Sequence, residues 1–331
     1  MTMHTTRRRL LVGASVLLAA PAVLRRRALA ATTLTLGHGA APGNPRSVAA
    51  EAFAKLVGEK TGGRVKVNIA GSEQLGNDAA MLTNMRMGAL DITANSQGAV
   101  SALVPELATI GLPFLFEDSA AAFRVLDGPI GAELGEKFTA VGMTPLGWWD
   151  NGIRHTTNSK RPINTPADLQ GLTIRTPADP MTIDIFQALG ASTEQIAFSE
   201  LYVALQQGVV DGQENPLANI ATSKLYEVNK YISLTGHKWE CNPLLMSQIA
   251  LARLGADLEP VQAAAKEATD LQRKLAQEAA AKHLAEFKAN SELAVNEVDR
   301  AAFQTATASV VEKWKTDYSD FVTKLLSAAK A

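Results

Sequence analysis

The chain has 331 residues, of which 47% are hydrophobic and 20% charged, a composition typical of a soluble globular protein long enough for about two domains. Its net charge of −1 conceals an asymmetry: residues 1–30 hold six arginines and no acid, so the rest holds 26 basic and 33 acidic groups, a net charge of −7. An acidic body argues against nucleic acid as a partner, because phosphate contacts need clustered Lys and Arg. The single cysteine, Cys241, excludes an internal disulfide and a cysteine-based metal cluster.

The first 30 residues have the pattern of an export signal. Thr6-Arg7-Arg8-Arg9-Leu10-Leu11 leads into an apolar run that ends at Leu24, and Ala28-Leu29-Ala30 offers a small-x-small cleavage site. The run is shorter than the ~20 residues that a membrane span needs, and Pro21 interrupts it, so an uncleaved anchor is the weaker alternative. The paired arginines resemble a twin-arginine signal. We therefore predict that residues 1–30 are removed and that the mature protein is periplasmic.

From residue 31 onward, strands and helices alternate, which predicts an α/β fold. The first run of predicted elements comprises strands at 34–36, 65–69 and 90–93 and helices at 44–61 and 77–87. The second comprises strands at 153–157, 172–176 and 209–211, a helix start at 165–168, and helices at 181–189 and at 200–207, the last capped by Ser199. The pattern indicates two α/β units, broadly 31–152 and 153–240.

Two long helical patterns follow. The first covers about 258–290 and is rich in alanine, and at 1.5 Å per residue it predicts a rod of roughly 48 Å that can cross both units. A coiled-coil dimer arm is the alternative, which the lack of a leucine heptad disfavours. A last helix is predicted at about 300–328. We expect domain I to be 31–152 plus about 241–280, and domain II to be 153–240 plus about 281–331.

No catalytic or cofactor motif stands out. Gly37-His38-Gly39-Ala40-Ala41-Pro42 follows a strand, but its third glycine is replaced and no acid ends the next strand, so it does not predict a dinucleotide site. The five histidines lack metal-ligand spacing, and there is no nucleophile elbow or phosphate loop. We therefore expect no catalytic residue, no cofactor and no metal. The loop after residue 37 is instead expected at a cleft edge.

Three polar residues are candidates for binding an organic acid: Arg154, Arg175 and Asn215. Neither arginine has an acidic neighbour within two residues, and a guanidinium offers a planar fork of donors that fits a carboxylate. Each has a structural alternative. Arg175 could form a salt bridge within its own domain, Arg154 could pair with Asp150 four residues away, and Asn215 could serve the turn before Pro216.

The order of several segments adds a family resemblance. The segments are Glu73–Gly76, Asn151–Thr157, Arg161–Ile163, Asp168–Pro177, Leu189–Ala191, Ala197–Gln206 and Val210–Pro216. Together they resemble the extracytoplasmic solute receptors of TRAP transporters, the dicarboxylate-binding and sialic-acid-binding receptor family, over nearly the whole mature chain. The resemblance implies a two-domain periplasmic binding protein of the Venus-flytrap type, with a ligand cleft between the domains and a long helix that spans both.

The resemblance also implies roles for single residues. Arg175 matches the arginine that forms a bidentate salt bridge with the ligand carboxylate, Arg154 a second contact, and Asn215 an amide that hydrogen-bonds the carboxylate region. Phe198 matches an aromatic wall, and Asp78 an acid that can meet ligand hydroxyls.

Three positions suggest an acid smaller than sialic acid. Gly39 and Ser96 stand where the sialic-acid branch has an asparagine and a glutamate, and we expect Trp149 to fill space near the arginine. The ligand is thus expected to be a C4-dicarboxylate, a sugar acid, or a hydroxy or aromatic acid. The expected partners are the small and large TRAP membrane subunits, and the receptor itself is expected to be a monomer. A ligand-sensing module for a membrane receptor is the alternative, and a periplasmic enzyme on the same fold is a weaker one.

Overall fold

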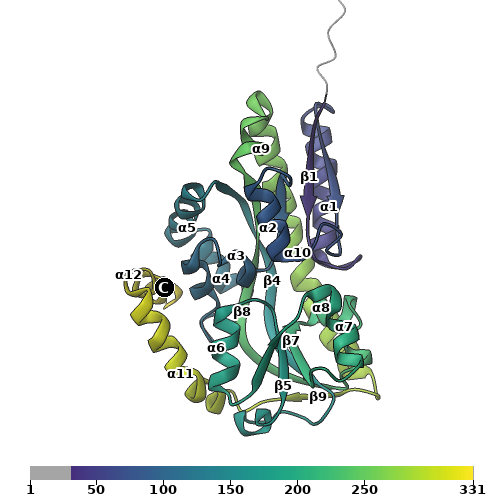
Figure 1. The fold of residues 1–331 in the computed structure, drawn as a ribbon, viewed down its shortest axis with the longest axis vertical. Helices are drawn as coiled ribbons and strands as arrows, with labels where there is room; N and C mark the ends of the chain where they lie inside the picture. Colours follow the sequence, from purple (N-terminus) through teal and green to yellow (C-terminus); the bar gives the residue numbers. More distant parts are fainter. Residues whose placement is uncertain (1–30, 331) are drawn as a thin grey trace, which may run out of the picture. The chain divides into compact units, whose positions relative to one another are not determined.

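The computed structural model describes residues 31–330, so the predicted export signal lies outside the described residues. Within them, the strands form one nine-stranded sheet in the order β2-β1-β3-β8-β4-β7-β5-β6, and β9 pairs with β8 (Figure 1). The strands are β1 (Thr32–Gly37), β2 (Val65–Ala70), β3 (Ile92–Ala94), β4 (Met143–Asn158), β5 (Thr173–Thr176), β6 (Ser192–Gln195), β7 (Gly212–Pro216), β8 (Tyr231–Ser247) and β9 (Ala294–Glu297).

Helices cover this sheet and connect its strands. The α-helices are α1 (Pro45–Lys60), α2 (Asp78–Arg86), α3 (Gln97–Val100), α4 (Ser119–Leu126), α5 (Pro129–Ala140), α6 (Pro180–Ala188), α7 (Phe198–Gln206), α8 (Leu217–Thr222), α9 (Gln248–Ala252), α10 (Leu258–Ala289), α11 (Arg300–Asp317) and α12 (Ser319–Lys330). Short 3₁₀ helices are η1 (Pro105–Gly111), η2 (Pro166–Leu169), η3 (Leu225–Glu227) and η4 (Gly255–Asp257). None of the helices in this part of the chain combines the length and apolar character needed to cross a bilayer.

Two long antiparallel strands, β4 and β8, join two halves of the sheet. The first half is β1, β2 and β3, which joins β8 where 92–94 pair with 244–246. The second half is β5, β6 and β7, which joins β4 where 212–216 pair with 154–158. The β4–β8 ladder has three register shifts, and such bulges bend and twist a strand.

The two strands that join the halves, β4 and β8, also contain the predicted domain limits. The limits at 152/153 and 240/241 fall inside β4 and β8, so continuous strands rather than linkers join the halves. From Ala31 onward the chain forms one compact unit. The exact division into domains I and II therefore stays a prediction. Strand β8, which the sequence pattern did not predict, is the element that completes the shared centre of the sheet.

The long helix predicted at 258–290 is confirmed as α10, which has 32 residues. It packs against α1 of the first half, against β4, and against α8 of the second half. Gln272 fixes it to β4, because its side chain accepts from the backbone N–H of Asp150 at 2.6 Å and donates to the Asp150 carbonyl at 2.7 Å. Gly147 permits this approach, since a Cβ at that position would overlap the hydroxyl of Thr269.

Three local predictions are wrong. The single helix at 300–328 is two helices, α11 and α12, separated by Tyr318, whose ring stacks on Trp314 at 5.5 Å. The strand predicted at 209–211 begins only at Gly212. Ser199 does not cap a helix, because α7 begins at Phe198 and the backbone N–H of Ser199 donates elsewhere.

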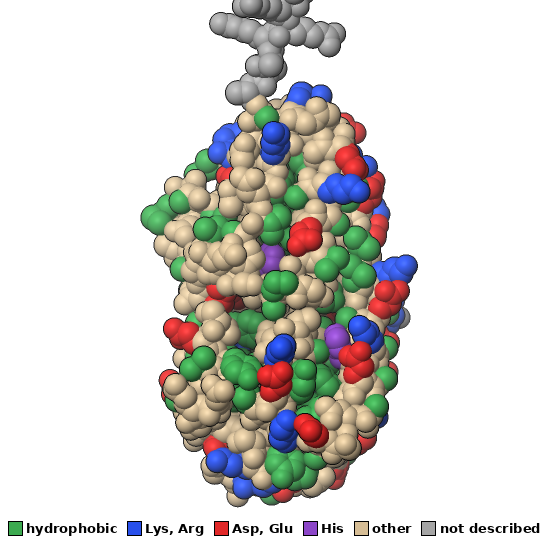
Figure 2. All heavy atoms as spheres, turned by 90° about the vertical axis from the view of Figure 1, so that its right-hand side faces the viewer, with side chains coloured by type: hydrophobic (Ala, Val, Ile, Leu, Met, Phe, Trp, Pro, Cys, Tyr) green, Lys and Arg blue, Asp and Glu red, His purple; other side chains and the backbone are tan. Residues whose placement is uncertain are grey.

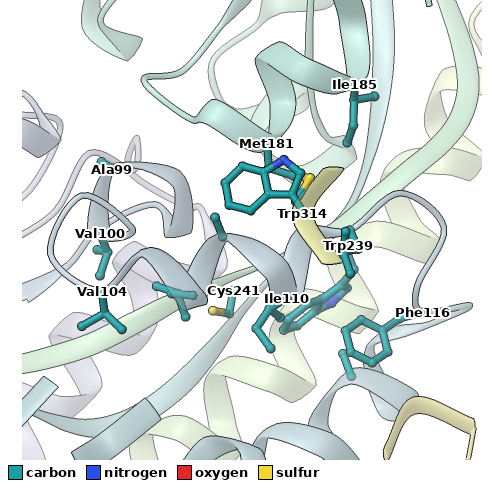
Figure 3. Close-up of a cluster of buried hydrophobic side chains, with 14 of the residues drawn as sticks. Ala99, Val100, Val104, Ile110, Phe116, Met181, Ile185, Trp239, Cys241 and Trp314 are labelled. Carbon is teal, nitrogen blue, oxygen red and sulfur yellow. The ribbon is translucent and has the colours of Figure 1, made fainter. Parts of the chain in front are cut away.

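The largest apolar core lies where α3, α4, α6 and η1 meet β8. Figure 3 shows Trp239 of β8 close to Ile110 and Phe116, with Cys241 on the same strand. The Trp239 ring meets the rings of Phe116 and Phe123 edge to face, with centroids 5.9 and 5.4 Å apart. A second apolar cluster lies between α1, α10 and the first half of the sheet. These cores hold both halves around β4 and β8.

Candidate ligand-binding site

Residues from both halves line one cavity of about 240 Å³. That volume is below the roughly 300–1,000 Å³ of pockets for drug-sized ligands, which favours a small ligand. The lining residues are Gly39, Arg46, Glu73, Asn77, Asp78, Ala79, Ser96, Ala99, Asn151, Arg154, Arg175, Pro177, Ala178, Gln195, Ile196, Ala197, Phe198, Asn215 and Asn219. Basic and acidic side chains are mixed over the face drawn in Figure 2. Because residues 31–331 carry a net charge of −7, attraction for an anion must come from the cavity itself.

Arg175 is the third residue of β5 and is only 3% exposed. Its Nε and Nη2 donate to the carbonyl of Ile196 at 2.8 and 2.6 Å, and Phe198 lies with its ring centre 5.8 Å from the guanidinium carbon. Within residues 31–330, no carboxylate lies within 4.0 Å of it, and Nη1 has no acceptor. Burial lowers the pKa of Arg175 to about 10. Arg175 is thus a buried cation that lacks a counterion in the described chain.

Arg154, on β4, is the opposite case. Its Nε and Nη2 bind both carboxylate oxygens of Glu214, and its Nη1 binds Glu240. Burial would lower the pKa of Arg154, but these two carboxylates hold it above its ordinary value. Likewise, burial would raise the pKa of Glu214, but Arg154 and His237 bring it down to about 2. Arg154 therefore belongs to an ionised network under the cavity floor.

This arrangement corrects the expected partner of Arg154. Asp150 does not pair with it. The Asp150 carboxylate instead accepts from the indole N–H of Trp239 at 3.0 Å, and burial raises its pKa to about 6. The strands β7 and β8 bring Glu214 and Glu240 to the arginine, and sequence spacing could not show this.

Asn215, on β7, lines the cavity beside Arg154. Its amide nitrogen donates to Gln213 at 2.6 Å, and its oxygen accepts from Arg154 at 3.3 Å and from Asn219 at 3.1 Å. Asn219 in turn accepts from Asn44 of the first half at 2.8 Å. A chain of amides thus extends from the cavity floor to the other half of the sheet.

Two further predicted residues also line the cavity. Phe198 begins α7 beside Arg175, and Asp78 begins α2. The Asp78 carboxylate accepts from the backbone N–H of Ser96 at 3.1 Å and from the Ser96 hydroxyl, and burial raises its pKa. The structure therefore brings Arg154, Arg175, Asn215, Phe198 and Asp78 to one cavity.

Trp149 is not part of this cavity, which corrects the expected position. It is fully buried in the apolar cluster beside α10, where its indole N–H donates to Thr269 at 3.0 Å. Residues alternate faces along a strand, so Trp149 of β4 contacts the helix layer instead. Trp149 therefore does not limit the size of the ligand.

Two charged lining residues were missed in the sequence. Arg46 is the second residue of α1; its Nη1 donates to the Ala94 carbonyl at 3.0 Å, while its Nε is buried with no partner in the described chain. Glu73 lies in the turn after β2. The sequence contained one signal for Arg46: a cation in the first turn of a helix interacts unfavourably with the helix dipole, so another interaction must favour its presence there.

Among residues 31–330, no three His, Cys, Asp or Glu side chains are grouped in a way that could hold a metal ion. Cys241 is buried, and its thiol donates to Gln97 at 3.3 Å. The cavity lining contains neither histidine nor cysteine.

A cavity lined by both halves of the sheet, with a buried arginine that lacks a carboxylate partner in the described chain, is suited to binding a small anionic solute. The chain belongs to the bacterial extracellular solute-binding protein family 7 (DctP), whose model matches residues 36–317. The resemblance to TRAP solute receptors and the two-domain binding-protein fold class are thereby confirmed.

The chain matches one relative over only part of that relative's length and another over nearly its whole length. The uncharacterized protein y4mM of Sinorhizobium fredii is 70% identical over 94% of this chain, and the chain spans 58% of its length. The 2,3-diketo-L-gulonate-binding periplasmic protein YiaO of Escherichia coli is 32% identical, over 90% of this chain and 91% of its own.

Solved structures agree with this fold. The sugar acid binding protein DctPAm of Advenella mimigardefordensis, in complex with galactonate, has a TM-score of 0.88 at 32% identity and covers 91% of this chain and 99% of its own. A TRAP periplasmic solute binding protein of Polaromonas bound to D-erythronate has a TM-score of 0.86 at 35% identity, with coverage of 91% and 98%. One from Sulfurospirillum deleyianum with bound succinate has a TM-score of 0.85 at 33% identity, with coverage of 90% and 99%.

Proposed function

We propose that this chain is the periplasmic receptor of a TRAP transporter, which captures a small organic carboxylate and delivers it to the membrane subunits. One observation carries the ligand class: Arg175 is buried at the cavity without a carboxylate partner in the described chain. A buried charge is costly unless it is paired, so the site favours an anion that supplies the missing partner.

The geometry explains how such a ligand is held. Nη1 of Arg175 has no acceptor among residues 31–330, and Nη1 and Nη2 together offer the fork that a carboxylate fits. Arg154 and the amide of Asn215 border the same cavity and supply further donors. Because both halves of the sheet line the cavity, a ligand that contacts both stabilises the closed arrangement.

The ligand class follows from size and from the neighbours. The cavity of about 240 Å³ suits a small acid, and structural neighbours hold galactonate, D-erythronate and succinate. For this chain, a sugar acid, a hydroxy acid and a C4-dicarboxylate are therefore the candidates. The chemistry is reversible capture, and no residue is assigned a catalytic role.

Titration calorimetry with a panel of these acids tests the proposal. The wild-type chain is expected to bind at least one of them, and replacing Arg175 is expected to abolish that binding. Binding that survives this substitution, or no binding of any acid in the panel, would refute the assignment.

Transport and sensing are separated by a second experiment. Vesicles that contain the small and large membrane subunits should accumulate the ligand only when the receptor is present. Lack of receptor-dependent uptake would favour the sensing alternative.

A further inference from the structure

The turn that carries Glu73 has an unusual backbone. Ser72 and Glu73 have φ angles of 53° and 59°, in the left-handed region that residues other than glycine rarely adopt. The turn is fixed by bonds from the Glu73 N–H to the His38 carbonyl at 3.2 Å and from the Gly76 N–H to the Glu73 carbonyl at 2.9 Å. Backbone strain of this kind is concentrated at functional sites. Here it places Glu73 in the cavity wall.

Gly39 provides the space that the Glu73 side chain occupies. A Cβ at position 39 would lie 3.3 Å from Cγ and 3.4 Å from Oε1 of Glu73, which is tighter than ordinary packing. A side chain at 39 would therefore press against the Glu73 side chain, which would have to shift by a few tenths of an ångström. Gly39 thus leaves room for the Glu73 side chain in the cavity wall.

The two oxygens of Glu73 have different surroundings. Oε2 accepts the backbone N–H of Ser199, in the first turn of α7, at 3.0 Å, so Glu73 links the first half to the second. For Oε1, no donor exists in the part of the chain that the structure describes. An acceptor in the cavity wall with no donor is suited to a ligand hydroxyl.

The charges around this wall disfavour a second carboxylate. Glu73 and Asp78 contribute two carboxylates, and Arg46 contributes one cation without a carboxylate within 4.0 Å among the described residues. The formal charge of these three lining groups is −1. A ligand carboxylate placed against Glu73 and Asp78 would face like charges, whereas hydroxyl groups would find acceptors in these acids and donors in Arg46.

We propose that Glu73 is a specificity-determining residue, which accepts a hydrogen bond from a ligand hydroxyl and rejects a second carboxylate. The preferred ligand class is then a polyhydroxylated monocarboxylate, with its carboxylate on Arg175 and its hydroxylated end at Glu73. This assignment rests on the proposed function, because Arg175 fixes the orientation of the ligand.

Calorimetry with ligands matched in chain length tests the assignment. D-erythronate and succinate are both four-carbon acids, and D-galactonate and adipate are both six-carbon acids; each pair exchanges hydroxyls for a second carboxylate. The wild type should bind the better hydroxy acid at least ~10-fold more tightly than its matched dicarboxylate. Glu73→Gln keeps the shape but removes the charge, so it should weaken the hydroxy acid by about 10-fold to 100-fold and strengthen the dicarboxylate.

Two more variants complete the design. Glu200→Gln removes one charge from an exposed residue of α7 outside the cavity lining and should bind as the wild type does. Glu73→Gly removes the carboxylate and also relieves the left-handed backbone, so it should fold at least as well while it loses the preference. A dicarboxylate bound as tightly as its matched hydroxy acid, or an unchanged preference in both Glu73 variants, overturns the assignment. Arg175-dependent binding would survive that result, whereas loss of all binding would refute the proposed function itself.

Discussion

Replacing Arg175 by Met should abolish ligand binding without weakening the ligand-free fold. The pKa of Arg175 is lowered by burial from 12.5 to about 10, so below about pH 10 its charge is less favourable in the folded chain than in the unfolded one. At 1.36 kcal/mol per pKa unit, this cost is up to about 3 kcal/mol. Losing the two bonds to Ile196 offsets about 1–2 kcal/mol of the gain. The free energy of unfolding should therefore stay the same or rise by up to about 2 kcal/mol.

Binding should respond in the opposite direction. Removing one partner of a buried ion pair typically costs about 3–5 kcal/mol, or roughly two to four decades of affinity. The assay is calorimetry on the best-binding acid beside denaturant unfolding of the ligand-free protein. Arg161→Met is a control for the lost backbone bonds alone, because the exposed Arg161 also donates to two backbone carbonyls, at 3.0 and 2.7 Å, and lies outside the cavity. An Arg175→Met protein that binds normally, or that unfolds without ligand while the control stays folded, would show that Arg175 is a structural residue.

Three more predictions concern charged residues. Arg154→Met should lower the free energy of unfolding by about 3–5 kcal/mol in denaturant titrations, because Glu214 and Glu240 lose their buried partner; an unchanged midpoint would contradict this. Burial raises the pKa of Asp150 to about 6. Between about pH 4 and pH 6 the unfolded chain therefore releases the Asp150 proton while the folded chain keeps it, so the free energy of unfolding should fall as the pH rises. Asp150→Asn should flatten this slope in denaturant titrations and add up to about 3 kcal/mol at pH 7. Replacing both Arg7 and Arg8 by Lys should leave unprocessed precursor in the cytoplasm on immunoblots of cell fractions, and normal processing would return the general secretory route.

Helices with clear boundary signals could be predicted from the sequence. Asn44-Pro45 marks the start of α1, and the Asn44 side chain accepts from the N–H of Arg46 at 3.0 Å as such a cap should. The periodic pattern from 258 to 290 likewise predicted α10. These signals are local, so they need no knowledge of the tertiary structure.

Strand β8 could not be found in the same way, because almost all of it is buried. A strand with one solvated face alternates in polarity, but β8 carries buried polar residues such as Lys238 and Glu240. Their partners come from distant elements: Lys238 binds Asp179, and Glu240 binds Arg154. Such pairing makes burial of charge possible, but it leaves no periodic pattern in the sequence.

For the candidate site too, the local motifs were visible in the sequence, but the contacts between distant residues were not. The motifs around Arg175 and Asn215 identified the cavity, yet residue type alone could not separate a binding arginine from a structural one. The separation depends on counterions: Arg154 has two carboxylate partners, while Arg175 and Arg46 have none within 4.0 Å in the described chain. For Arg46 the only signal in the sequence was its unfavourable place in the first turn of a helix, because its lack of a carboxylate partner is a property of the folded chain.

Arg154 and Arg175 therefore have different physical tasks, although both line the cavity. Arg154 binds Glu214 of β7 and Glu240 of β8 from its place on β4, so its charge stabilises the strands that connect the two halves. That charge is already neutralised, and a ligand can gain only a hydrogen bond from it. Arg175 has no carboxylate partner among the described residues, so a ligand carboxylate would gain the full ion pair there. Because an unpaired buried cation disfavours the ligand-free state, part of the binding free energy comes from relieving that cost. Affinity should hence depend far more on Arg175 than on Arg154, although both face the same cavity.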